Sequence, residues 1–183
     1  MDNKIIHTAT TKTGKTISFR YPTIADVEIL KDYIKELSVE KTFILFQGQQ
    51  KTLEQEKKGL KEKIKAISEN KAVFILAFIN GKLAGLSDVE LQPMAKSHVG
   101  DLGITVAKKY RGEEIGKLLM GLVLVEAVKK IRELKIITLE CFAINIAANN
   151  LYRKLGFVEY DHLPDGLKCR GKFSDSILMY KKI

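Results

Sequence analysis

Residues 111–117 (RGEEIGK) have the composition of an anion-binding turn. They follow a predicted strand and open a predicted long helix, whose first amides have no acceptor within the helix. The helix dipole adds about half a positive charge at this end. Gly112 and Gly116 allow a phosphate to approach the backbone, while Arg111 and Lys117 add positive charge. The turn is therefore a candidate phosphate site, although an ordinary strand-to-helix turn has the same form.

The cysteines and histidines lack the spacing of metal ligands. Cys141 and Cys169 stand alone, and the three histidines are scattered along the chain. We expect neither a bound metal nor a disulfide framework. No histidine accompanies Cys141 in the sequence, which argues against covalent catalysis through its thiol.

The elements that carry these groups follow from apolar periodicity and turn residues. Strands are predicted over residues 16–21, 73–79, 82–92, 98–107, 136–142, 157–160 and 174–181, and helices after residue 26 and over residues 51–65, 114–132 and 145–155. Asn80-Gly81 predicts a type I′ hairpin turn between two of the strands. This order predicts an α/β fold with a mixed sheet and helices on both of its faces.

Two apolar stretches carry predictions about burial. The long helix is expected to bury Leu118, Leu119, Leu122, Val125 and Ile131. The cluster at residues 43–46 (FILF) lies between the first two helices, and we expect it in the core rather than in a substrate pocket.

Length and charge limit the classes of function. The chain has 183 residues, which suits one domain over residues 1–183. Its net charge of +9, from 31 Lys and Arg against 22 Asp and Glu, attracts polyanions. Much of the excess lies on the Lys-rich helix at 51–65, whose charged residues are typical of a solvent-exposed helix face. Because no aromatic residues alternate with these lysines, we do not expect nucleic acid as a partner. With no apolar run of about 20 residues and no signal-peptide core, we expect no membrane contact and a cytoplasmic location.

Two segments resemble motifs of one family. ITVAKKYRGEEIGKLLMGLVL is similar to the coenzyme A-binding motif of the GNAT acetyltransferases, which reads Arg or Gln, two residues, Gly, one residue, then Gly or Ala. NIAANNLYRKLGF, from Asn145 to Phe157, resembles the second family motif, and FRYPTIAD near the start extends the resemblance to most of the chain. Glu114 occupies the position of the first family glycine. We expect its side chain in solvent, in the first turn of the helix, where a negative charge is mildly stabilising.

The resemblance implies a GNAT fold: a mixed, mostly antiparallel sheet whose splayed strands hold acetyl-CoA as cosubstrate, with no metal. The strand at 136–142 should splay away from residues 104–106, where a backbone amide would polarise the thioester carbonyl. Tyr152 would protonate the leaving thiolate. The cofactor-binding residues implied are Ile104, Thr105, Val106, Arg111, Gly112, Glu113, Glu114, Ile115, Gly116, Lys117, Asn145 and Tyr152.

An amine acceptor makes a general base useful, because a lysine-like amine of pKa about 10.4 is almost entirely protonated at neutral pH. Glu140 is the first candidate, since its spacing from the second motif is similar to that of the proposed base of the ribosomal-protein alanine acetyltransferases. Glu90 is the second. Asp88, Asp101 or no dedicated base remain open, and each carboxylate could equally form a structural ion pair.

The implied reaction is direct acetyl transfer from acetyl-CoA to a primary amine in a ternary complex, and the alternative is a non-catalytic module that binds coenzyme A. The acceptor stays open among protein N-termini, lysines, polyamines, amino acids and small amines, as does a homodimer. The positive net charge argues against a polycationic acceptor such as a polyamine. In this family the pocket is built from variable segments, here residues 36–50 and 162–173.

Overall fold

A computed structural model describes residues 4–183. Its strands are Ile5–Thr10 (β1), Thr16–Arg20 (β2), Ala72–Ile79 (β3), Lys82–Leu91 (β4), Val99–Val106 (β5), Ile136–Phe142 (β6), Val158–Cys169 (β7) and Lys172–Lys182 (β8). Its α-helices are Val27–Glu40 (α1), Leu53–Ser68 (α2), Ile115–Lys130 (α3) and Ile146–Lys154 (α4). No helix of this described part is long and apolar enough to cross a membrane.

The strands form one eight-stranded sheet in the order β1-β2-β3-β4-β5-β6-β8-β7. Every neighbouring pair is antiparallel except β5 and β6, which run parallel. The mixed sheet predicted from the order of elements and the mostly antiparallel pairing implied by the family resemblance are both confirmed. The parallel pair places the end of β5, where α3 begins, beside the end of β6, where α4 begins.

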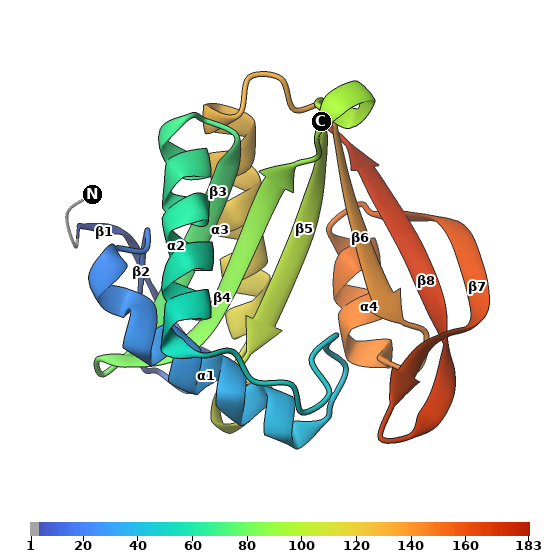
Figure 1. The fold of residues 1–183 in the computed structure, drawn as a ribbon, viewed down its shortest axis with the longest axis horizontal. Coiled ribbons are helices and arrows are strands. Elements are labelled where there is room, and N and C mark those ends of the chain that lie inside the picture. The colour runs from blue at the N-terminus through green and yellow to red at the C-terminus, as the bar shows by residue number, and fades with distance from the viewer. Residues whose placement is uncertain (1–3) are drawn as a thin grey trace.

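Helices cover both faces of the sheet, with α1 and α2 in front and α3 behind in Figure 1. The alternation of side chains along β4 separates the two faces. A Cβ at Gly85 would meet Leu119 of α3, whereas Asp88 is paired with Lys63 of α2. The buried apolar side chains form one continuous cluster that extends over both faces. Each face of the sheet therefore has its own helical layer.

Most of the predicted elements are present. Asn80 and Gly81 both have positive φ, 48° and 72°, as the type I′ turn requires. Gly156 (φ 85°) follows the end of α4, where glycine is favoured. The periodicity analysis missed β1, because this edge strand is mostly exposed and carries little apolar pattern. It also stopped β7 at residue 160, although the exposed strand continues to Cys169.

Two burial predictions were wrong in part. Val125 is 64% exposed, since α3 is apolar almost all round and the buried stripe instead runs through Ile115, Leu119, Met120, Val123 and Ala127. Phe43, Leu45 and Phe46 are also exposed rather than core, and only Ile44 of that cluster packs against the core.

Candidate active site

The sheet opens between β5 and β6. Their parallel pairing covers only Val99 to Asp101 against Ile136 to Thr138, and the strands then diverge as the resemblance implied. Beyond the divergence, β5 stays paired with β4 as far as Val106, and β6 stays paired with β8 as far as Phe142. A cavity of about 920 Å³ lies at this gap, between the two legs of the sheet.

The inner edge of β5 offers unpaired backbone groups to the gap. The Ala107 amide donates to the Ala84 carbonyl (2.9 Å), which sets the alternation of the antiparallel ladder. By this alternation the amide and carbonyl of Thr105 belong to the ladder with β4, while those of Ile104 and Val106 point toward β6. The amide of Ile104 therefore faces the gap, and Thr105 reaches the cavity through its side chain.

The turn before α3 presents further amides. No acceptor among residues 4–183 is recorded for the amides of Glu114, Ile115 and Gly116, which open the helix. A Cβ on Gly116 would lie 3.6 Å from Leu151 and 3.9 Å from Val106, both ordinary contacts, so packing alone does not require glycine there. The amides thus form a cradle at the α3–α4 end of the gap, and a phosphate fits this cradle.

The side chains of the turn mostly point elsewhere. Arg111 forms an ion pair with Glu40 of α1 (2.8 Å) and donates from Nε to the Val106 carbonyl (3.0 Å). Glu113 is buried against the β1–β2 turn, where Lys15 donates to it (2.5 Å) and holds the pKa of its carboxyl below the usual value. Lys117 is exposed. Unlike Arg111, it forms no ion pair with another of the described residues.

Glu114 lies at the N-cap of α3, one residue before the first turn in which we expected it, with its side chain in solvent and φ at 62°. Glycine adopts this left-handed backbone without strain, which accounts physically for the glycine of the family motif.

Tyr152 of α4 reaches the same cavity from the α3–α4 face. Its ring is 8% exposed and packs at 6.3 Å from Phe157, and this burial raises the pKa of the phenol. The hydroxyl has no hydrogen-bond partner among the described residues and is not sealed from solvent, so it opens into the cavity. Asn145 also lines the cavity and accepts from the Ala148 amide (3.4 Å) at the start of α4.

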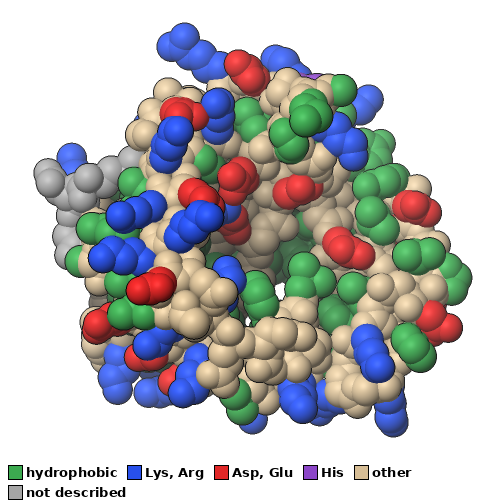
Figure 2. Space-filling model, in the orientation of Figure 1, with side chains coloured by type: hydrophobic (Ala, Val, Ile, Leu, Met, Phe, Trp, Pro, Cys, Tyr) green, Lys and Arg blue, Asp and Glu red, His purple; other side chains and the backbone are tan. Residues whose placement is uncertain are grey.

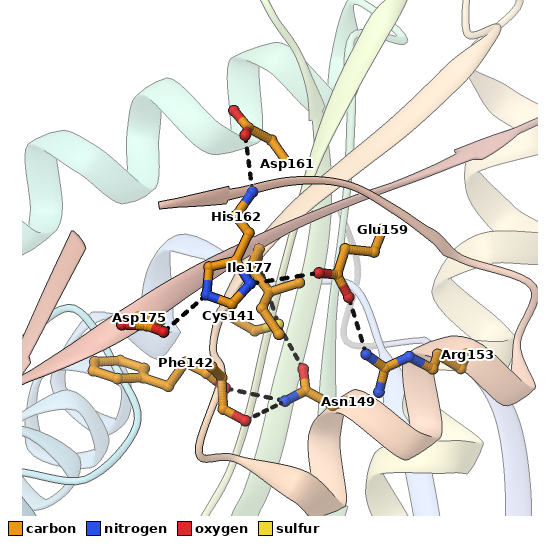
Figure 3. Close-up of polar contacts among 10 residues, drawn as sticks. Cys141, Phe142, Asn149, Arg153, Glu159, Asp161, His162, Asp175 and Ile177 are labelled. Carbon is orange, nitrogen blue, oxygen red and sulfur yellow. Dashed lines mark hydrogen bonds and ion pairs between the residues drawn. The ribbon is translucent and has the colours of Figure 1, made fainter. Parts of the chain in front are cut away.

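Asn149, which the sequence analysis did not single out, fixes α4 against β6 (Figure 3). Its Nδ2 donates to the carbonyls of Phe142 (3.1 Å) and Ala143 (2.9 Å), and its Oδ1 accepts from the Cys141 thiol (2.8 Å). Burial raises the pKa of Cys141 to about 11, so this thiol is a poor nucleophile at neutral pH. The position of Asn149 in the NIAANN segment was the only sequence signal for this role. Its contacts with β6 fix the position of Tyr152, which follows less than one helical turn later.

Three of the candidate carboxylates line the cavity on the α1–α2 face: Asp88, Asp101 and Glu140. Glu140 accepts from Ser176 Oγ (2.5 Å), and Asp101 accepts from Thr138 Oγ1 (2.6 Å). Glu90 is not among the lining residues and is paired with Lys63, which also holds Asp88. The structure thus brings Asp88, Asp101 and Glu140 to the gap and leaves Glu90 outside the cavity lining.

Asp88 is the carboxylate whose protonation the surroundings alter most clearly. Burial raises its pKa, and the ammonium of Lys63 at 2.6 Å only partly opposes that effect. A Cβ on Gly103 would approach Asp88 Oδ1 to 2.8 Å, so glycine at this position makes room for the carboxylate. A carboxylate with a raised pKa accepts a proton more readily near neutral pH.

An apolar wall closes the cavity opposite these carboxylates. It consists of residues 43–46 from the α1–α2 connection, with the ring of Phe43 tilted against that of Phe142 of β6 at a centroid distance of 5.7 Å. Figure 2 shows the front of the molecule hollowed at its centre, with acidic side chains above and to the right of the hollow and basic side chains to its left and at the outer edge of the view. The amide cradle and Tyr152 lie on the opposite, α3–α4 face, so the gap connects two chemically different sides of one sheet.

A mixed sheet split between two parallel strands, with a helix N-terminus at the split, is the fold that the resemblance to the GNAT acetyltransferases implied. The family model described as the acetyltransferase (GNAT) family matches residues 32–157, and the chain belongs to this family. A search of curated proteins finds no match.

Solved structures share the fold. An acetyltransferase of the GNAT family from Streptococcus pneumoniae is 29% identical, with a TM-score of 0.82 over 91% of this chain and 99% of that chain. A ribosomal-protein-alanine N-acetyltransferase from Brucella melitensis is 23% identical, with a TM-score of 0.79 over 90% and 99%. A putative acetyltransferase from Salmonella typhimurium, solved with its cofactor acetyl-CoA, is 14% identical, with a TM-score of 0.78 over 91% and 93%.

Proposed function

We propose that this protein transfers the acetyl group of acetyl-CoA to a primary amine by direct attack in a ternary complex. One observation carries the proposal: a single gap in the sheet joins an unpaired amide cradle on one face to a group of carboxylates on the other. The cradle suits a phosphate-bearing donor, and the carboxylates suit an amine. Such a gap can bring the two reactants together.

The donor side fits coenzyme A in shape and in charge. The amides of Glu114, Ile115 and Gly116 suit the pyrophosphate, and the exposed Lys117 lies nearby. The unpaired edge of β5 beyond Asp101 can bind an extended arm as an added strand would. Bound acetyl-CoA would supply an activated acyl carbon at the centre of the gap.

The chain's own residues have separate roles in this proposal. The Ile104 amide donates to the carbonyl oxygen as negative charge develops on it. Glu140, which lines the cavity and has no Lys or Arg within ion-pair distance among the described residues, accepts a proton from the attacking amine. Tyr152 gives its hydroxyl proton to the departing sulfur, since that hydroxyl has no other recorded partner.

The test is an acetyl-CoA turnover screen against classes of amine. Released thiol would be followed spectroscopically and the acetylated amine identified by mass spectrometry, with the rate in the absence of amine as background. We expect thiol release matched by acetylated product for at least one class. Coenzyme A binding without turnover on any amine would replace the proposal with a non-catalytic binding module.

A further inference from the structure

The acceptor side of the cavity carries an excess of negative charge, although the whole chain carries +9. We infer that the acceptor is a small primary amine that bears a second cationic group, such as an aliphatic diamine. This inference rests on the acetyl transfer proposed above. One nitrogen reacts, and the other stays protonated and is bound by a carboxylate.

Neutral groups hold two of the cavity carboxylates. Asp101 accepts from Thr138 Oγ1 (2.6 Å) and Gln92 Nε2 (2.7 Å), and Glu140 accepts from Ser176 Oγ (2.5 Å). These donors are neutral, so they leave the negative charge of each carboxylate without a counter-ion. Both residues are exposed to solvent at the cavity, where a carboxylate without a counter-ion can bind a cation.

The basic residues nearby are too few to compensate this charge. Lys63 is shared between Asp88 and Glu90, so one positive charge faces two negative charges. Within the described residues, Lys96 is the only Lys or Arg that lines the cavity, and it forms no ion pair there. An incoming ammonium group would complete the balance.

The spacing of the carboxylates suits two nitrogens on one short chain. Asp101 pairs in register with Thr138, and Glu140 follows Thr138 by two residues on the same face. This displacement is roughly 7 Å along the strand. The reacting amine therefore lies near Glu140 while a second ammonium binds at Asp101, and the apolar wall at residues 43–46 covers the methylene groups between them.

The transfer then balances in atoms and charge. The reacting nitrogen attacks as the neutral amine and forms a bond to the acetyl carbon as the carbon–sulfur bond breaks. One of its protons passes to Glu140, the sulfur takes a proton from Tyr152, and solvent then carries a proton from Glu140 back to Tyr152. The second nitrogen keeps its proton throughout.

The net charge of +9 argued against a polyamine acceptor, but the carboxylates at the cavity reverse that expectation for a small diamine and not for a basic macromolecule. Lys and Arg side chains lie to the left of the hollow and at the outer edge of this face (Figure 2), so a long polycation would meet like charge outside the cavity. Screening limits such interactions to about 8–10 Å at physiological ionic strength. A small dication inside the cavity is therefore governed mainly by the adjacent carboxylates.

The test compares 1,4-diaminobutane with 1-aminobutane, which differ in the second nitrogen. We expect the wild-type kcat/KM to favour the diamine by about tenfold or more, since a charge-assisted contact of this kind is typically worth roughly this factor. Asp101→Asn keeps the shape and removes the charge, and it should lower the diamine-to-monoamine ratio by about tenfold, chiefly through KM.

Two variants serve as controls. Asp101→Glu retains the charge and should retain most of the preference. Asp32→Asn makes the same chemical change on an exposed part of α1, away from the cavity, and should leave the ratio as in the wild type.

Other outcomes overturn the inference. Equal kcat/KM for the two amines, an Asp101→Asn effect that is the same on both, or a preference for a basic peptide α-amine each contradict a small dicationic acceptor while leaving acetyl transfer intact. Coenzyme A binding without turnover of any amine would instead remove the proposed function, and this inference with it.

Discussion

Tyr152 has a buried ring, whereas its hydroxyl is open to the cavity and has no hydrogen-bond partner among the described residues. Burial raises the pKa of this phenol, so it is protonated at neutral pH and can act as an acid. Tyr152→Phe keeps the packing against Phe157 and removes only the hydroxyl. We expect kcat to fall by roughly 10- to 10³-fold while the Kd for acetyl-CoA, measured by calorimetry, changes little. Tyr160→Phe, which removes an exposed hydroxyl at the cavity wall, is the comparison. Wild-type kcat in Tyr152→Phe would reduce this residue to a packing role.

Glu140 and Glu90 have the same side chain in different surroundings, which makes them suitable for a matched comparison. Glu140 accepts a hydrogen bond from Ser176, whereas Glu90 is paired with Lys63. Glu140→Gln should lower kcat/KM by roughly 10²-fold near neutral pH, because the amine then lacks its proton acceptor. The loss should shrink as pH rises, since more of the amine is already neutral. Glu90→Gln, whose carboxylate is paired with Lys63 outside the cavity lining, should have a much smaller effect on the same pH–rate profile. The reverse order of effects would assign the base to β4, where Asp88 also lies.

At the scale of elements, the start of α3 has to admit a phosphate. Gly116→Asp places a carboxylate at the open amides and should raise the Kd for coenzyme A in calorimetry by about tenfold or more, because like charges then meet. Gly121→Asp is the control, since it makes the same change on the same helix at a position where a Cβ meets nothing within 4 Å. Equal affinities in the two variants would place the phosphate site elsewhere.

The β7–β8 hairpin contains a contact that depends on pH (Figure 3). His162 Nε2 lies 2.8 Å from Asp175 Oδ2, and this hydrogen bond raises the pKa of His162 above 6.5. The resulting stabilisation is complete below the unfolded pKa of about 6.5 and is lost as pH rises through the folded value. His162→Gln should therefore weaken hydrogen-exchange protection of the hairpin near pH 5.5, and the difference from wild type should narrow by pH 8.5. His98→Gln, which lies outside the hairpin, is the control for the loss of an imidazole, and a pH-independent loss in His162→Gln would indicate a packing effect.

Some elements could be predicted from the sequence because their signals are local. The limits of β6 and the Asn80-Gly81 turn depend on neighbouring residues alone. Other features depend on contacts made after folding. An apolar run such as residues 43–46 has the same sequence pattern whether it faces the core or a cavity. Arg111 has the position of a phosphate ligand in the sequence, and only the fold shows its ion pair with Glu40, 71 positions earlier.

The candidate site divides in the same way. Tyr152 and the amide turn were predictable because each lies within one continuous motif. The grouping of Asp88, Asp101 and Glu140 was not, since it depends on the register of three strands, two of which are separated in sequence by α3. The sharing of Lys63 between Asp88 and Glu90 likewise needs α2 to be placed on the sheet before the two carboxylates can be told apart.

For the whole molecule, net charge and cavity charge have opposite signs. The excess of +9 should speed the approach of coenzyme A, which carries several phosphate charges. Raising the salt concentration from about 50 to 500 mM should lower its association rate constant by roughly three- to tenfold in stopped-flow measurements, because screening shortens the reach of the protein's field. Pantetheine, which lacks the phosphates, is the control and should associate at a nearly constant rate. Equal salt dependence of both ligands would exclude long-range attraction as the cause.

The gap between β5 and β6 passes from one face of the sheet to the other, and this bears on the order in which products leave. The amide cradle opens on the α3–α4 face, whereas the carboxylates open on the α1–α2 face. Neither product has to move past the other, so we expect the relative dissociation rates, rather than obstruction, to decide whether the spent thiol or the acetylated amine departs first.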